Sequence, residues 1–241
     1  MSESFQIASP AAPTCTPPPT GWTIQCDFDG TISVGDVTDS LLQRFGGPGW
    51  QALEKAWESG RIGSRECMSG QVSLLDMSAE ELDAHLDRMS IDPHFKAFVA
   101  AARRRGIAVQ VVSDGMDRAI KRILRAHGLD DLPVIANQLV QIAERSWRLY
   151  APHARADCER ASGNCKCACL AQQRALHGRV LFVGDGSSDF CVSGKADFVL
   201  AKDRLIGHCQ SQRIAHAAFD GFRDALALML EITAPRIASH E

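Results

Sequence analysis

The sequence predicts an α/β fold, a Rossmann-like three-layer sandwich in which helices cover both faces of a central parallel sheet. Two observations lead to this prediction. Short apolar runs alternate with helical patterns along most of the chain, as expected of parallel strands that are buried on both faces. One stretch after the first strand contains helical patterns only, which indicates a small helical domain inserted at that point.

Four apolar runs are predicted as strands, and a fifth run is a further candidate. The four are WTIQCDF at 22–28, IAVQVVSD at 107–114, LPVIAN at 132–137 and RVLFVGD at 179–185, and the fifth is ADFVLA at 196–201. Helical patterns such as MDRAIKRILRAHG and CLAQQRALHG lie between them and end in glycine, a common signal for the end of a helix.

The predicted insert divides the chain into a core and a cap. Ser78 and Glu81 form a capping-box signature at the start of one of its helical patterns. We expect the α/β core at 21–34 and 91–241 and the helical cap at 35–90. Residues 1–20 are rich in proline and are expected to form a disordered or extended leader.

Composition excludes several classes of protein. A formal net charge of −3 argues against a broad nucleic-acid surface, and no apolar run is long enough to span a membrane. The odd number of nine cysteines, several of them in apolar segments, favours reduced thiols. We therefore expect a cytoplasmic protein with no nucleic-acid or membrane partner, whose oligomeric state the sequence leaves open.

Polar side chains follow three of the predicted strands. Asp27 and Asp29 end the first, Ser113 and Asp114 end the second, and Asp185 ends the fourth. Ligands bind at the carboxyl ends of strands in open parallel sheets, so these residues are expected to share one site. Grouped carboxylates repel one another and require a compensating cation. Mg²⁺ suits a site with few carboxylates and several waters.

The spacing of Asp27 and Asp29 brings both carboxylates to the same side of the strand. Residues i and i+2 of a strand face one way, so Phe28 is expected to turn into the packing layer. A single carboxylate at a strand end is usually explained as an N-cap of the next helix. Three converging strand ends favour a cation site instead.

Four motifs, in order over positions 22–200, resemble those of the haloacid dehalogenase superfamily, in its phosphoserine-phosphatase-like branch with a helical cap. DFDGTIS resembles the nucleophile motif, VVSDG the second, Lys166 in CKCACL the third and GDGSSD the fourth. More narrowly, GNCK, SRECMSGQVSLL and SDGMD are similar to segments of the methionine-salvage phosphatases that act on 2-hydroxy-3-keto-5-methylthiopentenyl 1-phosphate. The resemblance implies a Mg²⁺-dependent phosphatase of a small phosphomonoester.

The resemblance also implies a role for each acid of the site. Asp27 would be the nucleophile that takes up the phosphoryl group as an aspartyl phosphate, and Asp29 would be the general acid and base. Asp27 and Asp185 would bind Mg²⁺ through carboxylates and Asp29 through its backbone carbonyl. Asp189 would hold a metal-bound water.

The same resemblance places the transferring phosphoryl group. Ser113 and Lys166 would bind its oxygens, together with backbone N–H groups around Asp114 and Gly115. Elementary chemistry agrees, because a carboxylate can attack a phosphate dianion only after positive charge has cancelled their repulsion.

Two residues of the cap are candidates for substrate contact. Asp36 stands about where phosphoserine phosphatases have a glutamate that holds the substrate amino group, and the shorter side chain argues against phosphoserine. The alternative for Asp36 is an N-cap of the helix VTDSLL. Arg65 is either a surface residue or a cap arginine that contacts the substrate.

The cysteines near Lys166 leave three interpretations open. Cys158, Cys165, Cys167 and Cys169 could be packing thiols, a Cys158–Cys165 contact could brace the loop, or the group could bind zinc. Their spacing is not that of two C-x-x-C motifs, which argues against a zinc site.

Three other functions compete with the phosphatase hypothesis. They are a phosphoserine phosphatase, a phosphotransferase on the same scaffold, and a non-catalytic phosphate-binding module. A non-catalytic relative is expected to lose Asp29 or Lys166, and both are present.

Overall fold

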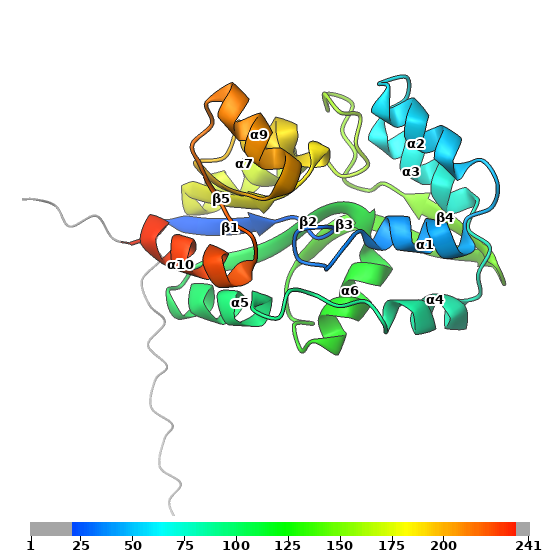
Figure 1. The fold of residues 1–241 in the computed structure, drawn as a ribbon, viewed down its shortest axis with the longest axis horizontal. Helices are drawn as coiled ribbons and strands as arrows, with labels where there is room; N and C mark the ends of the chain where they lie inside the picture. Colours follow the sequence, from blue (N-terminus) through cyan, green and yellow to red (C-terminus); the bar gives the residue numbers. More distant parts are fainter. Residues whose placement is uncertain (1–20, 235–241) are drawn as a thin grey trace, which may run out of the picture.

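The computed structural model describes residues 21–234, and the predicted leader at 1–20 lies outside them. A seven-stranded sheet has the order β4-β3-β2-β1-β5-β6-β7 (Figure 1). All neighbouring strands are parallel except β3 and β4, which confirms the predicted α/β fold. The strands are β1 (Trp22–Cys26), β2 (Ala108–Met116), β3 (Val134–Ala143), β4 (Ser146–Tyr150), β5 (Arg179–Gly184), β6 (Phe198–Ala201) and β7 (His216–Ala218).

The sheet differs from the prediction at both of its edges. Strand β3 continues past residue 137 and pairs with β4 in an antiparallel hairpin, and the short strand β7 adds the opposite edge. Buried and exposed residues alternate in β4, because one face of the hairpin is open. Strands with one open face lack the continuous apolar runs that indicate parallel strands, so the sequence did not predict the hairpin.

Helices cover both faces of the sheet (Figure 1). On one face lie α5 (Phe95–Arg104), α6 (Asp117–Ala126) and α10 (Phe222–Ile232), where the rings of Phe95 and Phe222 meet edge-to-face at 4.7 Å. On the other face lie α7 (Lys166–His177) and α9 (Asp203–Gln212), and Leu170 of α7 packs with Phe182 of β5. The connection from β5 to β6 contains η1 (Ser187–Asp189) and α8 (Phe190–Ser193).

Four helices separate β1 from α5, as the predicted insert requires. They are α1 (Val37–Phe45), α2 (Trp50–Glu58), α3 (Ser64–Ser73) and α4 (Ala79–Leu86). The capping box of α4 forms as predicted, with Glu81 N–H donating to Ser78 Oγ at 3.2 Å. Helices α2 and α3 stand on the α7 side of the sheet, whereas α4 lies on the α6 side (Figure 1). The cap bounds of 35–90 stay a prediction.

Within residues 21–234, none of the helices combines the length and the apolar character that crossing a membrane would need.

Candidate active site

Three adjacent strands bring the polar residues of the sequence motifs to one edge of the sheet. Cys26 at the end of β1 pairs with Val111 of β2 and with Val183 of β5. Asp27 continues this alignment, because its N–H donates to Val183 O at 2.9 Å. The register of β2 against β3 shifts between Val112 and Met116, an irregularity that redirects the side chains in that stretch.

Lys166 lies at the centre of this edge. It is the first residue of α7 and is 3% exposed. Its Nζ lies 2.8 Å from Asp27 Oδ2 and 2.6 Å from Asp189 Oδ1. Burial by itself would lower the pKa of Lys166, but Asp189 and Asp27 raise it above the ordinary value. The ammonium group therefore stays charged, because the two carboxylates compensate for its lost hydration.

Three carboxylates surround this lysine. Oxygen atoms of Asp27, Asp185 and Asp189 lie within 4.8 Å of one another. Burial, followed by the charge of Asp189, raises the pKa of Asp27 well above its usual range, and burial raises the pKa of Asp185 to about 6. One lysine leaves this group with excess negative charge. A divalent cation with a preference for oxygen ligands fits such a donor set.

Asp29 faces the other end of the site. Its Oδ1 accepts from Val37 N–H at 3.0 Å, so the start of α1 orients the carboxyl group. Burial, followed by the charge of Asp36, raises the pKa of Asp29 to about 8. A carboxyl group with this pKa is largely protonated at neutral pH and can donate a proton.

The end of β2 is fixed by hydrogen bonds to distant segments. Ser113 Oγ accepts from Gly115 N–H at 2.9 Å. The two oxygens of Asp114 accept from Asn164 N–H at 2.9 Å and from Ser64 Oγ at 3.0 Å. Burial raises the pKa of Asp114. Asp114 thus connects β2 both to the loop before α7 and to α3 of the insert.

Three supporting residues were missed by the sequence analysis. Asn164 donates to Ser113 O at 2.9 Å and to Ile135 O at 2.8 Å, and Thr31 Oγ1 donates to Asp185 Oδ1 at 2.6 Å. All three belong to quoted motifs, and the places of Asn164 and Thr31 beside Lys166 and Asp29 were a usable signal. Ser64 begins SRECMSGQVSLL in the predicted cap, where no predicted site residue except Arg65 lies beside it, so its contact with Asp114 was not foreseen.

A cavity of about 180 Å³ opens above these residues. Its floor includes Asp27, Asp29 and Asp185, and its far wall comes from α2 and α3 of the insert. Positions 64, 67, 68 and 71 line it from α3, which is the spacing of one helix face. The wall residues are Glu54 and Trp57 of α2 together with Ser64, Cys67, Met68 and Gln71 of α3.

The two candidate substrate residues of the cap have different positions. Asp36 lines the cavity and also caps α1, because its Oδ1 accepts from Asp39 N–H at 2.9 Å. Arg65 is exposed and is absent from the lining. Its neighbours Ser64 and Met68 face the cavity, which leaves Arg65 on a different face of α3. The structure therefore does not bring Arg65 to the site.

The cysteine cluster gains no support as a zinc site. Among the described residues, Asp27, Asp185 and Asp189 form the one group of three or more potential ligands with metal-binding spacing. Eight cysteines lie in the described chain and all are free thiols. Cys158 contacts Ser162 Oγ at 3.2 Å, and the thiols of Cys158 and Cys165 shift each other's pKa. A Cys158–Cys165 contact that braces the loop stays a prediction.

Comparison with known proteins agrees with the fold and the site. The model of the haloacid dehalogenase-like hydrolase family matches residues 24–193. A 2-hydroxy-3-keto-5-methylthiopentenyl-1-phosphate phosphatase of Geobacillus thermodenitrificans is 31% identical over 204 residues, 83% of this chain and 92% of the relative. A phosphatase of the same name from Brevibacillus brevis is 28% identical over 210 residues, 86% of this chain and 94% of the relative.

A solved structure of a phospho-aspartyl intermediate analogue of phosphoserine phosphatase has a similar fold. It aligns with a TM-score of 0.65 and 19% identity and covers 86% of this chain and 97% of that one. The protein therefore belongs to the haloacid dehalogenase-like hydrolase family. Within this family it is a phosphoric monoester hydrolase, a phosphatase.

Gly30 gives a test of the geometry around Asp185. Its φ is +71°, and an added Cβ would lie 2.6 Å from Asp185 Oδ2. Gly35 has a φ of +88° with nothing within 4 Å of the added atom, so it is a matched control for backbone strain. We expect Gly30→Ala to lower kcat/KM for p-nitrophenyl phosphate by roughly 100-fold, because a displacement of about 1 Å suffices for such a loss.

The control Gly35→Ala should keep its activity and lose only about 1–2 kcal/mol of unfolding free energy, measured in urea. Equal losses of activity in both variants would show that strain, and not the position of Asp185, determines the rate.

Proposed function

We propose that the protein hydrolyses 2-hydroxy-3-keto-5-methylthiopentenyl 1-phosphate, or a phosphomonoester with a similarly uncharged thioether group, through an aspartyl phosphate on Asp27. The observation that carries this choice of substrate is the charge of the cavity wall. Among the described residues that line the cavity, none is lysine, arginine or histidine. A leaving group that carries a carboxylate, such as phosphoserine, finds no cationic partner there.

Acidic residues of the cavity further disfavour substrates that carry a carboxylate. Asp36, Asp39 and Glu54 line the cavity on the insert side. Glu54 Oε2 accepts from Gln71 Nε2 at 2.7 Å, which keeps this carboxylate in place at the wall. Negative charge in this position repels a substrate carboxylate. The cavity therefore favours substrates whose only anionic group is the phosphate.

The apolar side chains of the wall suit a thioether. Trp57 and Met68 line the cavity from α2 and α3. Sulfur atoms make favourable contacts with aromatic rings and with other polarisable groups. The methylthio group named in the Geobacillus and Brevibacillus relatives is such a group.

The first chemical step is transfer of the phosphoryl group to Asp27. The Asp27 carboxylate attacks phosphorus, the bond from phosphorus to the ester oxygen breaks, and Asp29 gives its proton to that departing oxygen. Lys166 and Ser113 hold the phosphoryl oxygens with N–H groups at the end of β2. For Lys166 this role requires that its Nζ shares its hydrogen bonds between Asp189 and the incoming phosphate.

The second step returns the enzyme to its starting state. Asp29, now a carboxylate, takes a proton from a water molecule that attacks phosphorus, and the bond between phosphorus and Asp27 breaks. Inorganic phosphate leaves. Asp29 thus needs to lie close to both the leaving group and the water, and the hydrogen bond that it accepts from Val37 N–H holds its carboxyl group in place.

Mg²⁺ is the cation that we assign to the acidic cluster. Asp27 and Asp185 would hold it through carboxylates and Asp29 through its backbone carbonyl, with Asp189 supporting a water. When bound, it supplies positive charge that offsets the repulsion between the phosphate and Asp27. Thr31 and Gly30 support this arrangement, because both lie against the Asp185 carboxylate.

Substrate preference is tested with a panel of phosphorylated metabolites. We expect kcat/KM for the thioether ester to exceed that for phosphoserine by roughly 100-fold. Met68→Arg places a cation in the wall and should narrow this ratio by about tenfold, a change of ~1.4 kcal/mol. Arg65→Ala is the control on the neighbouring face of α3 and should leave the ratio unchanged. A wild-type preference for phosphoserine would contradict the assignment.

A rapid-mixing experiment distinguishes the roles of Asp27 and Asp29. Asp29→Asn keeps the nucleophile, and p-nitrophenolate leaves without a proton, so this variant should release about one equivalent of nitrophenolate per site and then stall. Asp27→Asn should release none. A burst from Asp27→Asn would assign the nucleophile to another residue.

Metal dependence is tested by removal and replacement. Treatment with EDTA should abolish turnover and Mg²⁺ should restore it, whereas Ca²⁺ should restore it poorly because it accepts a larger and less regular ligand shell. Asp185→Asn should raise the Mg²⁺ concentration needed for half-maximal activity. Full turnover by metal-free protein would contradict the proposed role of the acidic cluster.

A further inference from the structure

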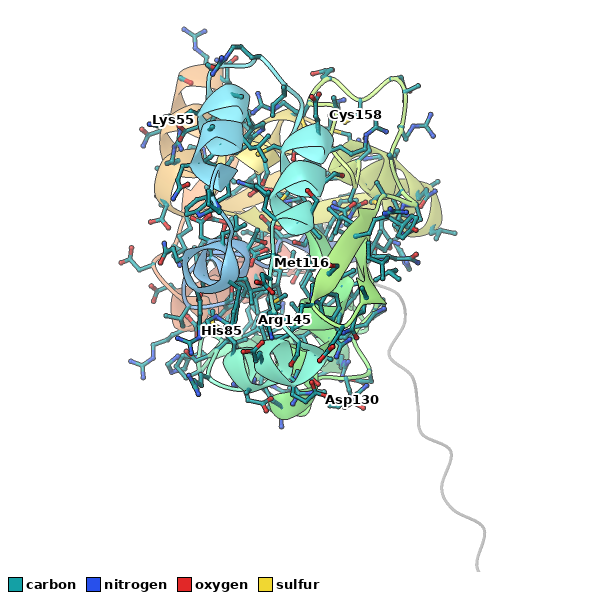
Figure 2. The ribbon with its side chains drawn as sticks, turned by 90° about the vertical axis from the view of Figure 1, so that its right-hand side faces the viewer. Lys55, His85, Met116, Asp130, Arg145 and Cys158 are labelled. Carbon is teal, nitrogen blue, oxygen red and sulfur yellow. The ribbon has the colours of Figure 1, made fainter. Side chains whose placement is uncertain are left out.

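A second cavity lies beside the start of α7 and has a volume of about 440 Å³. Four cysteines line it, which are Cys158, Cys165, Cys167 and Cys191. Phosphoryl transfer as described above uses none of them. Cys158 belongs to the loop that runs next to α3 (Figure 2), where Arg65 N–H donates to Ala161 O at 3.1 Å.

Two of these thiols lie close enough to influence each other. Cys167 lies in the first turn of α7 and Cys191 lies in α8, a helix that packs against α7, and each thiol shifts the pKa of the other. Both residues are half-buried free thiols that line this cavity. Two free thiols on packed helices beside one cavity are the arrangement that a new disulfide requires.

The surroundings of Cys167 favour its thiolate. The neighbouring Cys191 thiol, and then the charge of Lys195, lower the pKa of Cys167. Its position at a helix N-terminus acts in the same direction. The other pair is less suited, because Cys165 is only 6% exposed and burial raises its pKa.

The pair also lies next to the phosphate site. Cys167 follows Lys166 directly, and Cys191 comes two residues after Asp189. Lys166 and Asp189 form the 2.6 Å ion pair at the centre of the site. A bond between the two sulfurs would therefore connect the two segments that supply this ion pair.

We propose that Cys167 and Cys191 are a redox-active dithiol whose reversible oxidation to a disulfide slows the phosphatase. The oxidant is a low-molecular-weight disulfide such as glutathione disulfide. The Cys167 thiolate attacks one sulfur of the oxidant, its S–S bond breaks and one thiol leaves. Cys191 then loses its proton and attacks the Cys167 sulfur, which releases the second thiol. Two protein thiols are oxidised and one disulfide is reduced to two thiols.

Oxidation slows the reaction because it changes the distance between α7 and α8. An S–S bond is about 2.05 Å long, much shorter than the separation of two unbonded sulfur atoms in contact, so bond formation draws the two helix starts together. Lys166 and Asp189 move with them relative to Asp27. A displacement of about 1 Å in such a site can lower the rate by 10²-fold.

The test uses the full-length protein, first reduced with dithiothreitol and then incubated with glutathione disulfide. Peptide mapping without reduction should identify a Cys167–Cys191 link, and kcat for p-nitrophenyl phosphate should fall at least about tenfold in step with it. Dithiothreitol should restore both. Peptide mapping detects the disulfide whether or not the enzyme turns over a substrate, so this test stays valid even if the proposed substrate is wrong.

Matched variants decide between the thiols. Cys191→Ser, and independently Cys167→Ser, should keep the activity of the reduced protein and resist glutathione disulfide, while Cys158→Ser should remain sensitive. A link between Cys158 and Cys165 in place of Cys167–Cys191, mixed disulfides alone, or a Cys167–Cys191 bond with unchanged kcat would overturn the proposal.

Discussion

The buried contact of Lys166 with Asp27 and Asp189 is the interaction on which the rest of the site depends. All three side chains are almost fully buried, at 3%, 6% and 0% exposure. Removing one partner of a buried ion pair typically lowers the free energy of unfolding by about 3–5 kcal/mol, because the other charge stays buried without a partner. The group therefore fixes the end of β1, the start of α7 and the turn after β5 relative to one another. In the proposed mechanism the same lysine supplies the positive charge that makes attack by Asp27 on a phosphate dianion feasible.

A second layer of hydrogen bonds connects this centre to the cap. Asp114 accepts from Asn164 in the core and from Ser64 in α3, so the residue beside Ser113 also holds the wall of the cavity. The wall carries acids and apolar side chains, whereas the buried Lys166 lies outside the lining and contacts Asp27 of the floor at 2.8 Å. In the proposed mechanism, phosphate binding and leaving-group selection therefore depend on different segments of the chain.

Much of the core could be predicted because its signals are local. Apolar runs that end in Asp27, Asp114 and Asp185 indicate both the parallel strands and the edge where they meet. The β3–β4 hairpin was missed because its outer face is exposed and its apolar residues alternate. The position of Arg65 depends on which face of α3 turns to the cavity, and the meeting of Cys167 and Cys191 at one cavity depends on how α7 packs on α8. Neither is visible in the spacing of residues along the chain, since both arise from packing between elements.

The account rests on Asp27 as the residue that carries the phosphoryl group, and this is tested most directly by locating that group. Wild-type enzyme is mixed with radioactive p-nitrophenyl phosphate in the presence of Mg²⁺, quenched in acid within milliseconds and digested with a protease at low pH, where acyl phosphates survive. The account predicts up to one labelled phosphate per chain, on the peptide that contains Asp27, and loss of the label in alkali or hydroxylamine. Label on a serine or histidine peptide, or rapid turnover with no covalent label at any time, would contradict it.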